Sequence, residues 1–398
     1  MLWTSLLPLA LVLGVIFCFV RWLAYGKLTV RTPADWGNVL LLIVAVLSLW
    51  ITALPEKTTV QVLRLLAGMA MFYAIVNWGN SKDRVGWLIV LLLIAGVGLS
   101  LSALIGVDWV SEKATIIPNY IYARLPVRVS DPAHPNVMAG SLVLFAPLFL
   151  ALILFSSKPP FGKIIQSGFY VLSIISLIIV LSVIVLTLSR GAILAFFLSV
   201  LLLIAMRWKW GWVTGLAIVF IVLIIAGFGG ASWLENILDH HTLGTLVARL
   251  ELWSRAISVV QLFPFTGVGM GLFKEIIGYL MPLIAVEGVE IVHAHNLFLQ
   301  IAIDMGLPGL VAWISIQIVV LTVAWNLYKT GLACKEQWVI GLGVGLLGSC
   351  VAMITHGMVD AVVWGLRSAP MVWVFWGVTI AAGRVYLMGY KVAKSESV

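Results

Sequence analysis

Residues 168–188 read GFYVLSIISLIIVLSVIVLTL, without one charged side chain. A helix of about 20 apolar residues is long enough to cross the hydrocarbon core of a bilayer. Runs of this kind recur along the chain, which is 62% hydrophobic and only 10% charged. We therefore predict an all-α polytopic membrane protein, with residues 1–398 forming a single transmembrane domain.

Apolar runs near the length of a membrane span occur at about eleven places. The run from 296 is too long for one straight crossing, so we expect Gly306-Leu307-Pro308-Gly309 to break it into a short re-entrant helix and the true span. The first basic residue, Arg21, follows the first run, which is therefore expected to be a retained helix rather than a signal peptide. The expected spans lie near 4–20, 38–54, 60–79, 86–107, 137–155, 168–188, 191–206, 211–228, 296–327, 338–361 and 370–388.

Basic residues are distributed unevenly between the two sides of these spans. If the loop after the first span is cytoplasmic, the cytoplasmic segments hold 14 of the 24 Lys and Arg residues and four of the 16 acidic residues. This is the asymmetry of the positive-inside rule, and it places the N-terminus outside and the C-terminus in the cytoplasm. The net charge of +8 is then a consequence of topology and gives no support to nucleic-acid binding.

Two long loops, 108–136 and 229–295, fall on the outer side in this topology. Within the second, residues 245–262 carry apolar residues at helical spacing, which predicts an amphipathic helix lying along the membrane surface. Residues 263–271 then turn the chain. All six histidines lie on or near the outer side, so we expect this to be the working face: His134, His240, His241, His293, His295 and His356.

Arginines near this face are candidates for binding an anion. Arg190 lies in Ser189-Arg190-Gly191-Ala192 between two apolar runs, where a guanidinium either snorkels to lipid phosphates, caps a helix or binds a ligand. Arg249 and Arg255, on the expected amphipathic helix, favour the last reading, because a partly desolvated group of guanidiniums suits phosphate oxygens. Arg249 is the expected partner of Arg190, since Arg255 points elsewhere on the helix.

The segment His293-Ala294-His295-Asn296 places two imidazoles at the membrane boundary, where ionisable groups are costly and indicate a site. On a helix, two residues two apart diverge by about 200°, so the histidines are a poor zinc pair unless the segment is extended. His356 and Asp360 are one helical turn apart and form either a structural pair or a wall of the same cavity. No compact carboxylate cluster or Gly-rich phosphate loop is present, so we expect no metal, nucleotide or other cofactor.

Several of these blocks together resemble the O-antigen ligase and polymerase superfamily of bacterial membrane glycosyltransferases. Their order and spacing match from about 130 to 330, whereas the N-terminal third matches only as generic hydrophobic helices. The matching blocks are His134-Pro135-Asn136, Ser189-Arg190-Gly191-Ala192, Arg249-Leu250-Glu251-Leu252-Trp253, Pro264 with Gly267-Val268-Gly269-Met270-Gly271, and His295-Asn296-Leu297-Phe298-Leu299-Gln300 with Asp304-Met305-Gly306-Leu307-Pro308-Gly309.

The resemblance implies a GT-C-like fold and transfer of a glycan from polyprenyl (undecaprenyl) diphosphate to an acceptor hydroxyl, on the outer face of the bacterial inner membrane. The acceptor is a lipid A core sugar, the growing glycan or a protein hydroxyl. By this resemblance Arg190 and Arg249 would bind the diphosphate, with Arg255 as a further candidate, and His295 would act at the reacting hydroxyl. Candidates for supporting His295 or contacting the acceptor are His293, Asn296, Arg128, His356 and Asp360.

The chemistry of the residues agrees with this implication. A departing diphosphate develops negative charge, which requires cations, and the acceptor hydroxyl requires a base. We therefore expect a metal-independent ligase or polymerase whose partners are a lipid-linked oligosaccharide donor, a glycan or lipid A core acceptor, and membrane lipids. The alternative is a transporter of small solutes or ions such as bicarbonate. Transporters usually carry ionisable groups or broken helices near the middle of the bilayer. In this sequence the polar groups gather on one side instead.

Overall fold

The computed structural model describes residues 12, 14–16, 19–109, 117–122, 124–125, 129–155, 158–228, 246–280, 291–366 and 369–395. Over these residues the chain forms helices joined by turns, together with one isolated β-bridge between Val107 and Ala133. That bridge closes the base of the first long loop.

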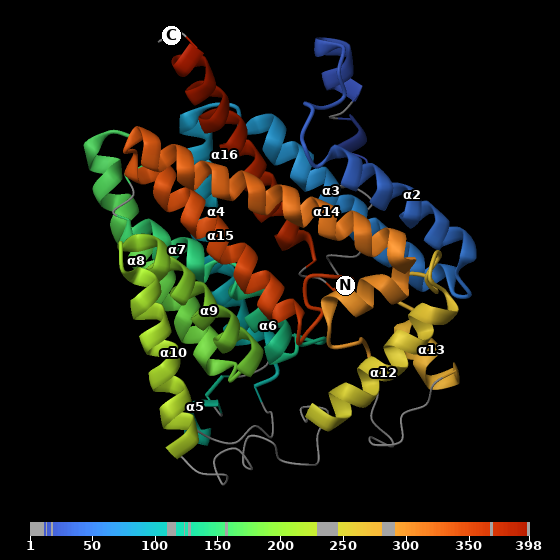
Figure 1. Cartoon of the computed structure of the whole chain (residues 1–398). Coiled ribbons are helices and arrows are strands. Elements are labelled where there is room, and N and C mark those ends of the chain that lie inside the picture. Colours follow the sequence, from blue (N-terminus) through green and yellow to red (C-terminus); the bar gives the residue numbers. More distant parts are fainter. Residues whose placement is uncertain are drawn as a thin grey trace.

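The helices follow one another with short connections, apart from the two long loops (Figure 1). In chain order they are α2 (Asp35–Ile51), α3 (Pro55–Trp78), α4 (Lys82–Gly106), α5 (Asn119–Tyr122), α6 (Pro135–Leu142), α7 (Ala146–Leu154), α8 (Lys163–Leu186), α9 (Arg190–Arg207), α10 (Gly211–Phe228), α12 (Leu246–Leu262), α13 (Phe273–Leu280), α14 (Leu297–Cys334), α15 (Gln337–Gly357) and α16 (Pro370–Ser395).

Eight helical stretches in the described part of the chain are long and apolar enough to cross a membrane, with α6 and α7 counted as one stretch. They coincide with eight of the expected spans. The runs at 38–54 and 211–228 correspond to the apolar helices α2 and α10, and the run at 4–20 lies mostly outside the described residues. The all-α polytopic membrane architecture is thus confirmed, whereas the count of eleven spans is not.

Helix α15 lies at the centre of the bundle, packed against α14, α7 and α9. Small residues allow this close approach, as they do in other membrane bundles. A Cβ atom added to Gly345 would lie 2.8 Å from the side chain of Leu148 on α7, and one added to Gly348 would lie 2.8 Å from Leu203 on α9. The C-terminal end of α15 is therefore held among its neighbours with little freedom to shift.

Helix α14 is broken at Gly306, where φ is 68° and ψ is −177°. The expected break at this position is confirmed. A Cβ atom added here would lie 2.7 Å from the carbonyl carbon of Phe265, so glycine is required both for the backbone conformation and for the space. Beyond the break, the N–H of Leu307 donates to the carbonyl of Pro264 at 2.7 Å.

The turn after α12 satisfies the other backbone groups that the break releases. The N–H of Val268 donates to the carbonyl of Ile303 at 2.8 Å, and the N–H of Gly269 donates to that of Asp304 at 3.2 Å. Inside a membrane protein, unpaired backbone groups are costly, so a broken helix needs partners of this kind. The turn after α12 thus anchors the break in α14.

Helix α12 confirms that residues 245–262 contain a helix. Its buried face, formed by Leu252, Ala256 and Val259, packs in a small core with Ile303 of α14, while Leu250 is exposed. Its position along a membrane surface remains a prediction. The beginnings of α6, α9 and α14 and the end of α15 meet at the same end of the bundle as α12 (Figure 1), and we call this the site end.

Candidate active site

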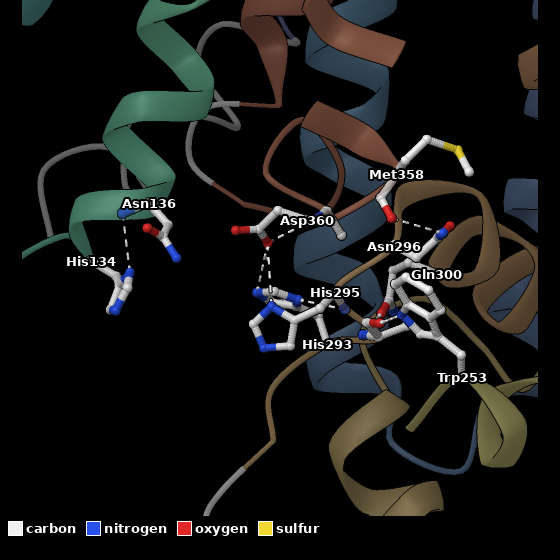
Figure 2. Close-up of polar contacts among 11 residues, drawn as sticks. His134, Asn136, Trp253, His293, His295, Asn296, Gln300, Met358 and Asp360 are labelled. Carbon is white, nitrogen blue, oxygen red and sulfur yellow. Dashed lines mark hydrogen bonds and ion pairs between the residues drawn. The ribbon is translucent and has the colours of Figure 1, made fainter. Parts of the chain in front are cut away.

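His293 and His295 lie at the site end in a non-helical segment directly before α14. The segment is therefore extended rather than helical, which is the case in which the two rings were expected to be able to converge. Their ring centroids are 4.2 Å apart, and both rings face one carboxylate (Figure 2). His293 Nε2 lies 3.5 Å and His295 Nδ1 lies 3.7 Å from Oδ1 of Asp360.

The backbone between the two histidines is fixed by side chains from two helices. The N–H of Ala294 donates to Oε1 of Gln300 on α14 at 2.8 Å, and its carbonyl accepts from Nε1 of Trp253 on α12 at 3.0 Å. These contacts hold His295 at φ 45°, a conformation that non-glycine residues rarely adopt. Strain of this kind persists only where surrounding contacts over-determine it, and it is common at functional sites.

Asn296 is the N-cap of α14. Its Oδ1 accepts from the N–H groups of Phe298 and Leu299, each at 3.0 Å. Its Nδ2 donates to the carbonyl of Met358, just beyond α15, at 3.1 Å. Both ends of the amide are therefore engaged, and Asn296 ties the histidine segment to the turn that carries Asp360.

Asp360 lies three residues beyond the end of α15, in the turn that leads to α16. His356 and Asp360 were expected to form either a structural pair or a wall of one cavity, and this choice stays a prediction. The two do not share a helix face, because α15 ends at Gly357, and the carboxylate faces His293 and His295. Its Oδ1 also accepts from the N–H of Ala361 at 2.8 Å. Burial raises the pKa of Asp360, but the approach of His295 and of the neighbouring imidazoles outweighs it and holds the pKa well below its usual range. Asp360 is thus an ionised carboxylate.

Both ring nitrogens of His293 face a polar partner. Nδ1 accepts from the N–H of His295 at 3.2 Å, so the proton of the neutral ring is assigned to Nε2, which faces Asp360. Burial lowers the pKa of His293 to about 4, which keeps the ring neutral near pH 7. His293 therefore has no free lone pair with which to accept a proton.

His295 differs from His293 in this respect. Its Nδ1 is buried 3.7 Å from the Asp360 carboxylate, too far for a hydrogen bond but close enough for the charge to orient the ring. With the proton on Nδ1, the lone pair lies on Nε2. Among the described residues no hydrogen bond to Nε2 is found, and the side chain is 20% exposed. Of the two rings, only His295 presents a basic nitrogen.

His356, in the last turn of α15, packs between glycines of α6 and α9. A Cβ atom on Gly140 of α6 would lie 2.8 Å from its Nδ1, and one on Gly191 of α9 would lie 3.6 Å from its Cδ2. The imidazole is buried and interacts electrostatically with Asp360 and Arg249. It brings the beginnings of α6 and α9 against the site.

Two of the three expected arginines lie close enough for their charges to interact. Burial lowers the pKa of Arg249, the Asp360 carboxylate acts in the opposite direction, and Arg190 adds to the lowering. Nε of Arg249 is buried and has no hydrogen-bond partner among the described residues. Arg190 is exposed and is the first residue of α9, whose N-cap Ser189 makes no side-chain cap. Two cations and an uncapped helix N-terminus together form a favourable environment for an anion.

The remaining candidates are placed differently. Arg255 lies six residues further along α12 than Arg249, and its Nη2 is 3.6 Å from Oε1 of Glu251. His134 is the N-cap of α6, with Nδ1 accepting from the N–H of Asn136 at 3.1 Å, and it lies across the site from His293 (Figure 2). Arg128 and the pair at 240–241 lie outside the described residues.

His293, His295 and Asp360 form a group that could hold a metal ion, because one ligand atom from each lies within 4.8 Å of the others. Because the segment is extended, the two histidines do not diverge as they would on a helix, and their geometry allows them to bind one metal ion. The hydrogen bonding argues against a metal, however. A histidine that binds a metal through Nε2 usually donates its other N–H, whereas Nδ1 of His293 accepts a hydrogen bond. This hydrogen bond favours a neutral His293 that faces the carboxylate.

Trp253 and Gln300 are structural residues of the site that sequence reasoning left without a role. Both belong to blocks of the resemblance, and Gln300 is four residues before Asp304, the spacing at which helical side chains meet. Gln300 Nε2 does donate to Asp304 Oδ1, at 3.0 Å. The spacing could have predicted this pair, but not its contact with Ala294.

Comparison with known proteins matches the central part of the chain to a family. Residues 175–314 match the family model described as O-antigen ligase. Over these residues the chain is similar to the O-antigen ligase family. The match includes Arg190, Arg249 and both site histidines, and it supports the O-antigen ligase and polymerase superfamily and a glycosyl-transfer function at a membrane. Among curated proteins, none matches this chain.

Proposed function

We propose that this protein is a metal-independent glycosyltransferase of the O-antigen ligase or polymerase type. It takes a glycan from a polyprenyl diphosphate donor and transfers it to an acceptor hydroxyl on the outer face of the bacterial inner membrane. The observation that carries the proposal is the difference between the two histidines. His293 turns one ring nitrogen to the N–H of His295 and the other to Asp360, whereas His295 turns Nδ1 to the ionised Asp360 and leaves Nε2 as a basic nitrogen.

His295 is the proposed general base. Its Nε2 takes the proton of the acceptor hydroxyl as the oxygen attacks the anomeric carbon of the donor sugar. The imidazolium that forms is stabilised by Asp360, which also keeps the ring in the required tautomer, as the carboxylate does in serine-protease triads. His293 positions His295 by accepting its backbone N–H.

Arg190 and Arg249 are the proposed ligands of the diphosphate. As the bond from the anomeric carbon to the diphosphate oxygen breaks, negative charge grows on the leaving group, and fixed guanidiniums stabilise it. The unpaired Nε of Arg249 and the beginning of α9 support this role. Arg255 would contribute at longer range, because it is paired with Glu251.

The proposed reaction needs neither metal nor nucleotide. The energy for transfer is stored in the sugar–diphosphate linkage, and the arginines supply the positive charge that a divalent ion supplies elsewhere. The hydrogen bond to Nδ1 of His293 supports this part of the proposal. The transporter alternative is not supported, since the arginines and histidines discussed above gather at the site end.

The test compares the two histidines. Purified His295→Ala should lose transfer by about 10²-fold or more, the usual cost of removing a general base, while its expression and thermal unfolding stay near those of the wild type. His293→Ala should lose less, because it removes a positioning contact only. Equal activity in His295→Ala, or a larger loss in His293→Ala, would refute the assignment of the base.

The same assay decides between the two kinds of transferase. Polyprenyl diphosphate glycan is incubated with candidate acceptors, and the products are separated by size. A single added block identifies a ligase, whereas a ladder identifies a polymerase. The absence of any product with all donors and acceptors, for protein whose helices are intact by circular dichroism, would count against glycosyl transfer altogether.

A further inference from the structure

Arg64 is the one charged residue between Lys57 and Lys82. It lies nine residues after the start of α3, or about 14 Å along the helix axis, and so within an apolar stretch long enough to cross a membrane. An ionisable side chain at such a position is costly and is usually retained for a function, with a specific partner. It also lies in the N-terminal third, outside residues 175–314.

The partner of Arg64 is the turn that carries Asp360. Nη1 of Arg64 donates to the carbonyl of Gly365 at 2.6 Å and to Oε1 of Gln61 at 3.3 Å. Gly365 has φ 70°, so this carbonyl belongs to a tight turn that only glycine adopts readily. The hydrogen bond is charge-assisted and satisfies a backbone group that has no helical partner.

The turn, residues 358–366, is attached to the bundle at three places. At its beginning, the carbonyl of Met358 accepts from Asn296 at 3.1 Å. Near its end, Nε1 of Trp364 donates to Oδ2 of the buried Asp304 at 2.8 Å. Arg64 holds the next residue, Gly365, and is the attachment that comes from α3. Asp360 lies between these attachments, so its place opposite the histidines depends on them.

We propose that Arg64 is a positioning residue of the transferase: from α3 it fixes the 358–366 turn and thereby sets the approach of Asp360 to His293 and His295. The inference rests on the proposed function for its catalytic consequence. Its structural consequence, a change in how the two histidines are held, is independent of that function and can be measured separately.

The experiment compares Arg64→Met with Arg84→Met. Methionine keeps a long apolar side chain suited to a membrane helix but cannot donate to Gly365. Arg84 is a matched control, because it also donates to a backbone carbonyl, that of Trp78, but at the far end of α3. We expect Arg64→Met to lower kcat by about 10- to 100-fold, the effect of one hydrogen bond to a charged group, and to change the donor KM by less than about threefold.

Two more variants separate positioning from loss of folding. Arg64→Lys retains one donor and should recover part of kcat. Gly365→Ala keeps Arg64 but strains the turn, because its Cβ would lie 3.3 Å from Oε1 of Gln61, and it should reproduce the fall in kcat. If Arg64→Met does not fold, Gly365→Ala decides. Wild-type kcat in Gly365→Ala and in Arg64→Met, or equal losses in Arg64→Met and Arg84→Met, would overturn the proposal.

A readout without substrate distinguishes failure of this inference from failure of the proposed function. The rate at which diethyl pyrocarbonate modifies His293 and His295 is followed by mass spectrometry in each folded variant. We expect the rate to change in Arg64→Met and Gly365→Ala and to stay at the wild-type value in Arg84→Met. Unchanged rates in all variants would refute the positioning role, even if the wild type proved inactive with every donor.

Discussion

Replacing Asp360 with asparagine tests the central contact of the site with little change in shape. The amide oxygen can still accept from the N–H of Ala361, the 2.8 Å hydrogen bond that orients the side chain. What disappears is the negative charge, which lies 3.5 Å from His293 and 3.7 Å from His295. The variant therefore separates the charge of Asp360 from its role in packing.

The size of the effect follows from the distance to His295. At 3.7 Å, a carboxylate and an imidazolium attract by about 4 kcal/mol at the effective dielectric constant of about 20 that suits protein sites. His295 carries its charge only after it has taken the proton from the acceptor. The attraction therefore stabilises the transition state and not the bound substrates. We expect Asp360→Asn to lower kcat by about 10³-fold and to leave the donor KM nearly unchanged.

The assay measures initial rates with purified protein in nanodiscs while the lipid-linked donor is varied. Asp131→Asn, an exposed aspartate of the first long loop, is the control for loss of a carboxylate and should behave as the wild type. If Asp360→Asn retains kcat within about threefold, Asp360 does not act on the base. If instead the donor KM rises while kcat is unchanged, Asp360 contacts the donor and does not orient the base.

Three further predictions concern the phosphates, the absence of a metal and the effect of pH. Arg190→Lys and Arg249→Lys should each lose most activity and bind lipid-linked donor more weakly, because an ammonium cannot reproduce the guanidinium fork, whereas Arg255→Lys should lose less; normal donor binding by Arg190→Lys would make that residue a membrane anchor. Turnover should survive excess EDTA and the absence of ATP, and loss of activity restored by Mg²⁺ or Mn²⁺ would contradict the arginine mechanism. The pKa of His293 is about 4 in the folded protein against an ordinary value of 6.5, so between these values the unfolded chain binds a proton that the folded protein does not. The temperature of thermal unfolding should therefore fall as pH drops from 6.5 to about 4, and His293→Gln should show a flatter dependence over the same range.

The helices were predictable because the signal that defines them is local. A run such as 168–188 has the length that a bilayer requires, and no tertiary contact is needed to make it helical. The break in α14 was predictable for the same reason, since Gly306 and Pro308 act on their own backbone. The partners of the break, in the turn after α12, are 35 or more residues away along the chain and leave no local pattern.

The histidine segment shows where local reasoning failed. Spacing alone left two cases open, divergent rings on a helix or convergent rings in an extended segment, and could not choose between them. The rings converge because Trp253 and Gln300 hold Ala294 and force His295 to φ 45°. A conformation imposed by two other helices cannot be derived from the residues that adopt it.

Asp360 was harder to place because the apolar pattern continues past the end of its helix. The sequence from Val351 to Trp364 gives no proline and only one glycine, Gly357, so the expected span was extended to 361. The helix ends at Gly357, where Met358 meets Asn296. The residue types at the site were thus predictable, but the partner of His295 was not.

Some residues of the site lie inside the segment that matches the family model, and others lie outside it. The proposed base and the diphosphate ligands lie within residues 175–314, whereas Asp360 and Arg64 lie outside that range on opposite sides of it. A base needs its orienting carboxylate, and the carboxylate needs a turn that is held in place. The chemistry proposed for His295 therefore depends on contacts from α3 and from the turn after α15, so the whole helical bundle, and not the matched segment alone, is the unit that would carry out transfer.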